Sequence, residues 1–89
     1  MSAEATIENI RGAIWTRIVE PDRGDLPAEA AVFLLKLDFR EADHQRLAEL
    51  NQKANEGLLT ASERAELEEY IRASDLITLL QSKARRSLN

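Results

Sequence analysis

The ten residues from Ala54 to Glu63 read as the end of one helix followed at once by the start of another. Gly57 can adopt the left-handed backbone conformation that closes a helix C-terminus. Thr60 and Glu63 have the spacing of a capping box, in which each side chain accepts a hydrogen bond from the backbone N–H of the other residue. This pattern predicts an antiparallel helical hairpin, with helices over about 39–56 and 61–86.

Two shorter helices are expected before this hairpin. A helix over about 6–19 is predicted because four isoleucines share helical spacing, although the β-branched residues of the same segment leave a strand as the alternative. These isoleucines are Ile7, Ile10, Ile14 and Ile18. After a turn over 21–25, a second helix is expected near Pro27 to Leu35. It is apolar almost all round, which indicates either burial on several sides or cover by a partner.

The predicted elements define an all-α chain of about four helices in a single domain, residues 1–89. Asp38 and Glu41 have the spacing of a second capping box, which would start the third helix. The last helix broadens its apolar side after Ser74, so the two N-terminal helices are expected to pack over its second half.

Composition indicates a small globular protein of the cytoplasm. Hydrophobic residues make up 44% of the chain and charged residues 31%, with a net charge of −4. The absence of cysteine suits a reducing compartment. Charged residues within the first twenty argue against a signal peptide, and no apolar run reaches the ~18 residues of a membrane span.

No residue pattern points to a catalytic, metal or cofactor site, so the chain is not expected to be an enzyme. His44 is the only histidine and is interpreted as a solvated side chain, because a zinc site normally needs several fixed ligands. A run of acids early in the last helix is interpreted as a solvated face, with an acidic surface that docks a basic partner as the alternative: Glu63, Glu66, Glu68 and Glu69. Glu68 with Arg72 and Glu49 with Lys53 have the spacing of helical ion pairs.

Two aromatic residues, Trp15 and Phe33, are expected in the core; the alternative is that they anchor a protein interface. Asn51 is expected at the exposed edge of an apolar stripe, with a role in pairing register as the alternative.

The favoured function is protein–protein interaction, through an apolar surplus on the last helix. Leu76, Ile77, Leu79 and Leu80 point over more than half of its circumference, so a partner protein or a second copy is expected to cover them. The alternative is a small dimeric nucleic-acid-binding regulator that uses the basic C-terminal end. Its candidate phosphate contacts are Lys83, Arg85 and Arg86.

The stretch from Phe39 to Leu88 resembles a family of small, largely uncharacterised bacterial helical proteins. The resemblance rests on the turn motif Gly57-x-Leu59-Thr60-x-x-Glu63, on Tyr70, and on the run Leu-Leu-Gln-Ser-Lys-Ala-Arg over 79–85. Such proteins are often encoded beside HNH-type nuclease-like proteins, which implies an antitoxin, immunity or accessory role by analogy. The family typically has Ser before the proline that opens the second helix. Leu26 stands there in this chain, which leaves Asp25 as the expected cap.

Overall fold

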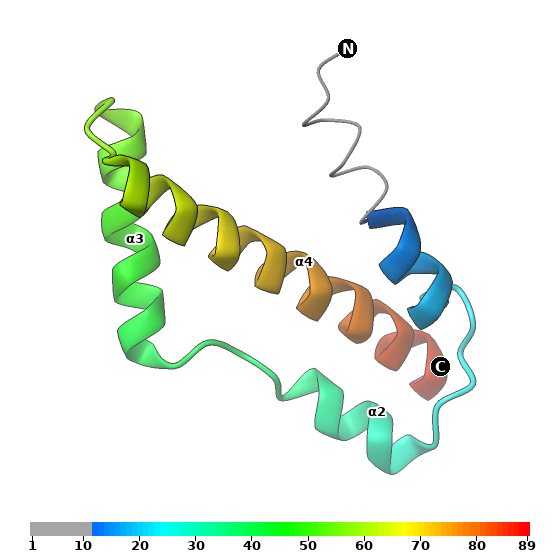
Figure 1. Ribbon diagram of the computed structural model, residues 1–89. Helices are drawn as coiled ribbons and strands as arrows, with labels where there is room; N and C mark the ends of the chain where they lie inside the picture. Colours follow the sequence, from blue (N-terminus) through cyan, green and yellow to red (C-terminus); the bar gives the residue numbers. More distant parts are fainter. Residues whose placement is uncertain (1–11) are drawn as a thin grey trace. The chain divides into compact units, whose positions relative to one another are not determined.

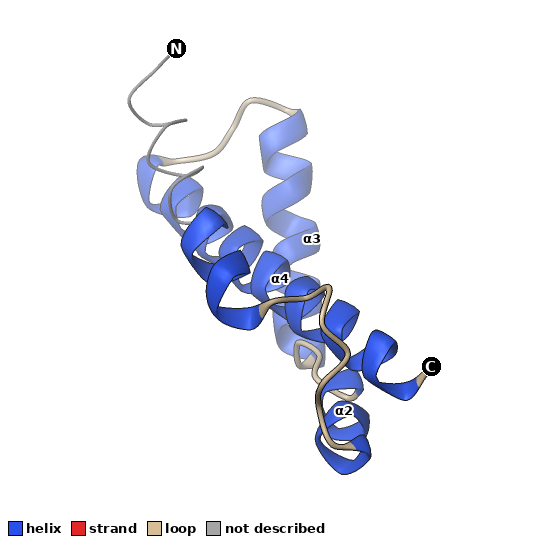
Figure 2. Cartoon of the chain, turned by 90° about the vertical axis from the view of Figure 1, so that its right-hand side faces the viewer, coloured by secondary structure: helices blue, strands red, loops and turns tan. Residues whose placement is uncertain are grey.

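A computed structural model describes residues 12–89, and this part of the chain is all-α, as predicted. Residues 12–19 are helical, and three further helices follow: α2 (Ala28–Leu35), α3 (Glu41–Asn55) and α4 (Ala61–Leu88) (Figure 1). Helices and loops account for all of residues 12–89, with no strand among them (Figure 2). The helix is therefore confirmed over its described half, 12–19. The rest of the predicted 6–19 helix lies outside the described residues.

The chain forms two compact units, and α4 contributes to both. The hairpin unit is Leu37–Ile77, which contains α3 and the first part of α4. The terminal unit is the chain up to Lys36 together with Thr78–Asn89. The expectation of one domain over 1–89 concerns both units together and stays a prediction.

The turn between α3 and α4 has the geometry that its sequence predicts. Gly57 has φ +70°, and it donates its N–H to the carbonyl of Ala54 while Leu58 donates to Lys53, the paired bonds of a Schellman motif. Thr60 and Glu63 then bond reciprocally: the Thr60 N–H to Glu63 Oε1 and the Glu63 N–H to Thr60 Oγ1, each at 3.1 Å. α3 therefore ends at Asn55 and α4 begins at Ala61, with a capping motif at each of these ends.

Three polar contacts give the register of the hairpin. Lys53 bonds to Glu63, Arg46 to Glu66, and Asp43 to Tyr70. Each step back along α3 is matched by a step forward along α4, so the two helices run antiparallel. Leu50 lies on the same side of α3 and is completely buried, which makes it the centre of the apolar contact in this unit.

The terminal unit is held by side chains from the last turns of α4. Lys83 donates to the carbonyl of Val19 at 2.8 Å and pairs with the Asp25 carboxylate at 2.8 Å. Gln81 donates to the carbonyl of Leu34 at 3.3 Å, and Ser87 accepts from the Leu26 N–H at 3.1 Å. The predicted packing of the N-terminal helices on the second half of α4 is confirmed within this unit.

A glycine allows the loop after residue 19 to lie directly against α4. A Cβ placed on Gly24 would stand 2.6 Å from the carbonyl oxygen of Arg86, closer than side-chain atoms pack. The buried residues of the terminal unit are correspondingly small: Val19, Ala31 and Ala84. Close backbone approach replaces large side chains in this core.

Two predicted helix caps are wrong. The N-cap of α3 is Arg40, without a side-chain cap, because the Asp38 carboxylate instead accepts from the Phe39 N–H at 2.7 Å and bonds His44 at 3.0 Å. The N-cap of α2 is Pro27, also without a side-chain cap, since the Asp25 carboxylate is paired with Lys83. Both acids bind a partner outside the capping position.

None of the helices in residues 12–89 combines the length and apolarity that a membrane crossing requires.

We expect Gly57→Ala to lower the free energy of unfolding by about 1–2 kcal/mol, because an L-residue pays that cost in the left-handed region. No atom lies within 4 Å of a Cβ at this position, so the loss would be conformational rather than steric. Chemical denaturation followed by circular dichroism measures it. The matched control is Gly12→Ala, also in open space but in a helical segment, where alanine should be neutral or stabilising. Equal effects at the two positions would contradict this account of the turn.

Candidate functional site

Large apolar side chains are exposed on both N-terminal helices of the terminal unit. Trp15 is 47% exposed and Phe33 is 64% exposed, so the prediction that these aromatics belong to the core is wrong. Their helices contribute small residues to the core instead, Val19 and Ala31. Exposed aromatic side chains of this size are characteristic of binding surfaces.

Three apolar residues share one side of residues 12–19. Ile14 and Ile18 lie one helical turn apart, and Trp15 is adjacent to them at 100° per residue. Their exposed fractions are 41%, 65% and 47% for Ile14, Ile18 and Trp15. The isoleucine spacing that predicted the helix therefore marks a face that the described chain leaves uncovered.

Helix α2 has two distinct faces. One face is inward: Ala31 is fully buried, and Ala30, Leu34 and Leu35 are half-buried. The opposite face consists of four exposed residues: Glu29, Val32 and Phe33 of α2, and Lys36, the C-cap residue that follows it. The apolar pattern all round this helix had indicated either burial on several sides or cover by a partner, and only one side is buried.

The residues predicted as the interaction surface are all half-buried. Leu76 and Ile77 belong to the hairpin unit, and Leu79 and Leu80 to the terminal unit. None of the four is among the exposed large apolar side chains of residues 12–89. The exposed large apolar side chains of α4 are instead Ile71 and Leu88, at 50% and 43% exposure, and five others lie on residues 12–19 and α2.

The three basic residues near the C-terminus have different environments. The side chain of Lys83 is only 12% exposed and is bound between Val19 and Asp25, and this contact lowers the pKa of the Asp25 carboxyl. Arg86 lies 3.7 Å from Asp22, and Arg85 is exposed. Lys83 therefore stabilises the terminal unit by joining α4 to Val19 and Asp25.

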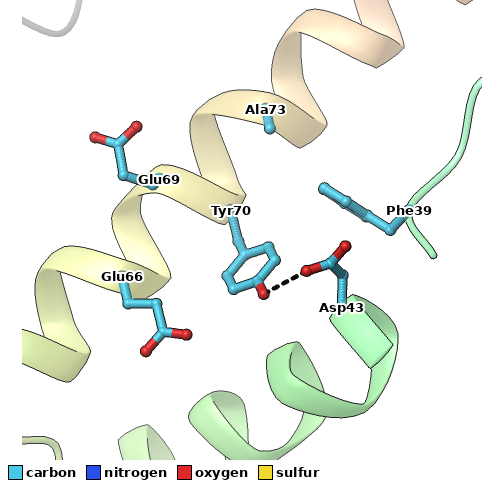
Figure 3. Close-up of a pocket in the computed structure, with 6 residues that line it drawn as sticks. All are labelled: Phe39, Asp43, Glu66, Glu69, Tyr70 and Ala73. Carbon is cyan, nitrogen blue, oxygen red and sulfur yellow. Dashed lines mark hydrogen bonds between the residues drawn. The ribbon is translucent and has the colours of Figure 1, made fainter. Parts of the chain in front are cut away.

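An open pocket of about 310 Å³ lies in the hairpin unit (Figure 3). It is lined by Phe39, Asp43, Glu66, Glu69, Tyr70 and Ala73. The Tyr70 hydroxyl donates to Asp43 at 2.8 Å, which raises the pKa of Tyr70, and the rings of Phe39 and Tyr70 meet edge to face. The bond between Tyr70 and Asp43 in this pocket joins α4 to α3, as in a structural contact between helices.

The two glutamates that line this pocket are ion-paired, Glu66 with Arg46 and Glu69 with Arg72. Arg46 donates to both oxygens of Glu66, at 2.9 and 2.8 Å, and this lowers the pKa of the Glu66 carboxyl. A general acid needs the opposite shift. Within residues 12–89, no three His, Cys, Asp or Glu side chains gather as potential metal ligands.

The acids early in α4 divide into two pairs. Glu63 and Glu66 bind cations of α3, Lys53 and Arg46, so the interpretation of all four as a solvated face is wrong for these two. Glu68 and Glu69 are exposed and pair with Arg72 on the same helix.

Two further residues singled out by the sequence, His44 and Asn51, lie in the hairpin unit. His44 bonds to Asp38 at 3.0 Å and meets the ring of Phe39 edge to face, while still 45% exposed, so it is partnered and not simply solvated. Asn51 is exposed, as expected.

No protein-family model, curated protein or solved structure matches this chain. The argument about function therefore depends on the exposed surfaces themselves.

The Glu63 carboxyl should make stability depend on acid pH. Lys53 and the Thr60 N–H lower its pKa from 4.5 to about 2, so its contribution is complete above about pH 4.5 and is lost as the pH falls towards 2. Glu63→Gln keeps the capping-box geometry but removes the charge. Urea midpoints measured between pH 2 and 5 should decline less steeply for this variant than for the parent. Glu68→Gln, on the exposed side of α4, is the control; an unchanged slope in Glu63→Gln would refute the assignment.

Lys83→Met should destabilise the terminal unit, because a chain of similar length remains but the bonds to Val19 and Asp25 are lost. A hydrogen bond to a charged group contributes about 1–3 kcal/mol, and we expect a loss in this range from thermal unfolding. Arg85→Met, at an exposed neighbouring position, should have little effect. Equal stability of the two variants would show that Lys83 has no structural role.

Proposed function

We propose that this chain is a non-enzymatic protein–protein interaction module whose contact surface lies on the N-terminal helices of the terminal unit. The observation that carries the proposal is the exposure of Trp15 and Phe33, the only tryptophan of the chain and one of its two phenylalanines. Tryptophan is enriched among the residues that dominate binding energy, and large aromatics dominate interface area. Covering one large apolar side chain contributes roughly 1.5–3 kcal/mol.

The hairpin unit supports a binding role over a catalytic one. Its pocket carboxylates are bound by Tyr70 and Arg46, which leaves them as parts of a scaffold. We therefore propose the hairpin unit as the stable support of the module.

The particular role we propose is that of an antitoxin- or immunity-like partner of a toxin or nuclease in the bacterial cytoplasm. The support is the resemblance carried by the turn motif at Gly57 and by residues 79–85. Small antitoxin-like proteins act by covering a surface of another protein, and an exposed apolar face on a short chain suits that task.

The structure gives less support to a nucleic-acid-binding regulator. Of the three candidate contacts, Lys83 is bound inside the terminal unit. Arg85 and Arg86 are two cations at the end of one helix, whereas phosphate recognition normally uses a broader basic face.

The proposal is tested by identifying the protein that co-purifies from the native host and measuring its affinity for purified variants. Trp15→Ser and Phe33→Ser should each weaken binding by about tenfold or more, since anchor residues carry most of the binding energy. Leu58→Ser is a matched control, because Leu58 is 63% exposed but lies in the turn of the hairpin unit. Parental affinity in both aromatic variants, with the fold intact by circular dichroism, would refute the proposed surface.

A further inference from the structure

The exposed face of α2 is self-complementary in charge. Its residues are Glu29, Val32, Phe33 and Lys36, so an acid lies at one end, a base at the other, and two large apolar side chains lie between them. We propose that this face binds the same face of a second copy of this chain, with the two α2 helices antiparallel. The inference rests on the proposed interaction function. It names a second copy of this chain as the partner of the α2 face.

Helical geometry places the four residues together. They occupy the i, i+3, i+4 and i+7 positions, which lie within about 100° of one another at 100° per residue. The opposite side of the helix is anchored by the fully buried Ala31. The face is therefore presented outward by a helix whose other side is fixed in the terminal unit.

The spacing is symmetric about a point midway between Val32 and Phe33. In an antiparallel pair related by a two-fold axis through that point, Glu29 of one copy meets Lys36 of the other, and the same contact occurs again on the other side. Val32 of one copy meets Phe33 of the other at the centre. Each charge then lies about 5 Å along the helix from the axis, at 1.5 Å per residue.

Neither charged side chain has an ion-pair partner among residues 12–89. They cannot pair with each other within one helix, because seven residues separate them by about 10 Å along its axis. A parallel arrangement of two copies would place Glu29 against Glu29 and Lys36 against Lys36. Charge therefore favours the antiparallel arrangement and excludes the parallel one.

The expected association is weak. α2 has eight residues, so a pair of these helices buries less than the ~1,200 Å² of a standard interface. Sedimentation velocity over about 1 µM to 1 mM, at low ionic strength, covers the affinity range of such contacts.

A charge exchange between the two positions tests the proposed register. Glu29→Lys places lysine against lysine at both ends of the pair, and Lys36→Glu places acid against acid. Each single variant should self-associate about tenfold or more weakly than the parent. The double variant Glu29→Lys/Lys36→Glu restores two opposite-charge contacts and should recover the parental affinity.

Mixing the two single variants gives a second, independent measurement. In a heterodimer of Glu29→Lys with Lys36→Glu, both ends again carry opposite charges, so the mixture should associate more tightly than either component does alone. Arg64→Glu is the matched control for Lys36→Glu: it makes the same charge change at an exposed position in the hairpin unit and should leave association unchanged.

Two results would overturn the inference: a monomer at all concentrations, or a dimer whose affinity is the same in all charge variants. Both are distinct from failure of the proposed function, which would appear as parental affinity for the heterologous partner in Trp15→Ser and Phe33→Ser. A monomer that still loses its partner on Phe33→Ser would leave the interaction module standing and assign the α2 face to that other protein.

Discussion

The Glu63 carboxylate performs two tasks on which the hairpin unit depends. It accepts the N–H of Thr60, which opens α4, and it binds Lys53 and Arg46, which belong to α3. Its side chain is only 13% exposed, while those of Lys53 and Arg46 are 43% and 33% exposed. One group thereby sets both where α4 starts and which part of α3 lies beside it.

The last turns of α4 hold the terminal unit together. α4 is one continuous helix to Leu88, and its part from Thr78 onward belongs to this unit. Lys83 and Ser87 are four residues apart and share a side of the helix, with the buried Ala84 next to them. That side binds the carbonyl of Val19, the Asp25 carboxylate and the Leu26 N–H.

Local signals predicted the helices well, and contacts between distant residues were not predicted. The turn at Gly57 and the helices around it follow from interactions within about four residues, which spacing alone reveals. Asp38, by contrast, has capping-box spacing but binds Phe39 and His44, and nothing in its local pattern distinguishes the two outcomes. Lys53 likewise has Glu49 at helical spacing, yet it pairs with Glu63, whose position the capping box already fixes.

The candidate site was missed for a related reason. Hydrophobicity shows that Trp15 and Phe33 need cover, but it does not show whether the cover comes from the same chain. The indication available was the apolar pattern all round α2, too wide for a helix with one buried side. The structure divides this pattern into an inward face, whose fully buried residue is Ala31, and an outward face that includes Val32 and Phe33.

The size of the chain explains why such outward faces matter for stability. A chain of 89 residues buries a smaller share of its surface than a larger domain does and keeps a small margin of stability. In the terminal unit, the buried side chains of Val19, Ala31 and Ala84 contribute to stability, together with the hydrogen bonds that α4 donates through Lys83 and Gln81. A partner that binds only the folded state stabilises it in proportion to the logarithm of its concentration over Kd. Binding of the proposed partner at Trp15 and Phe33 would add apolar contacts to those that the described part of this unit makes, and would link folding to recognition through the same two helices.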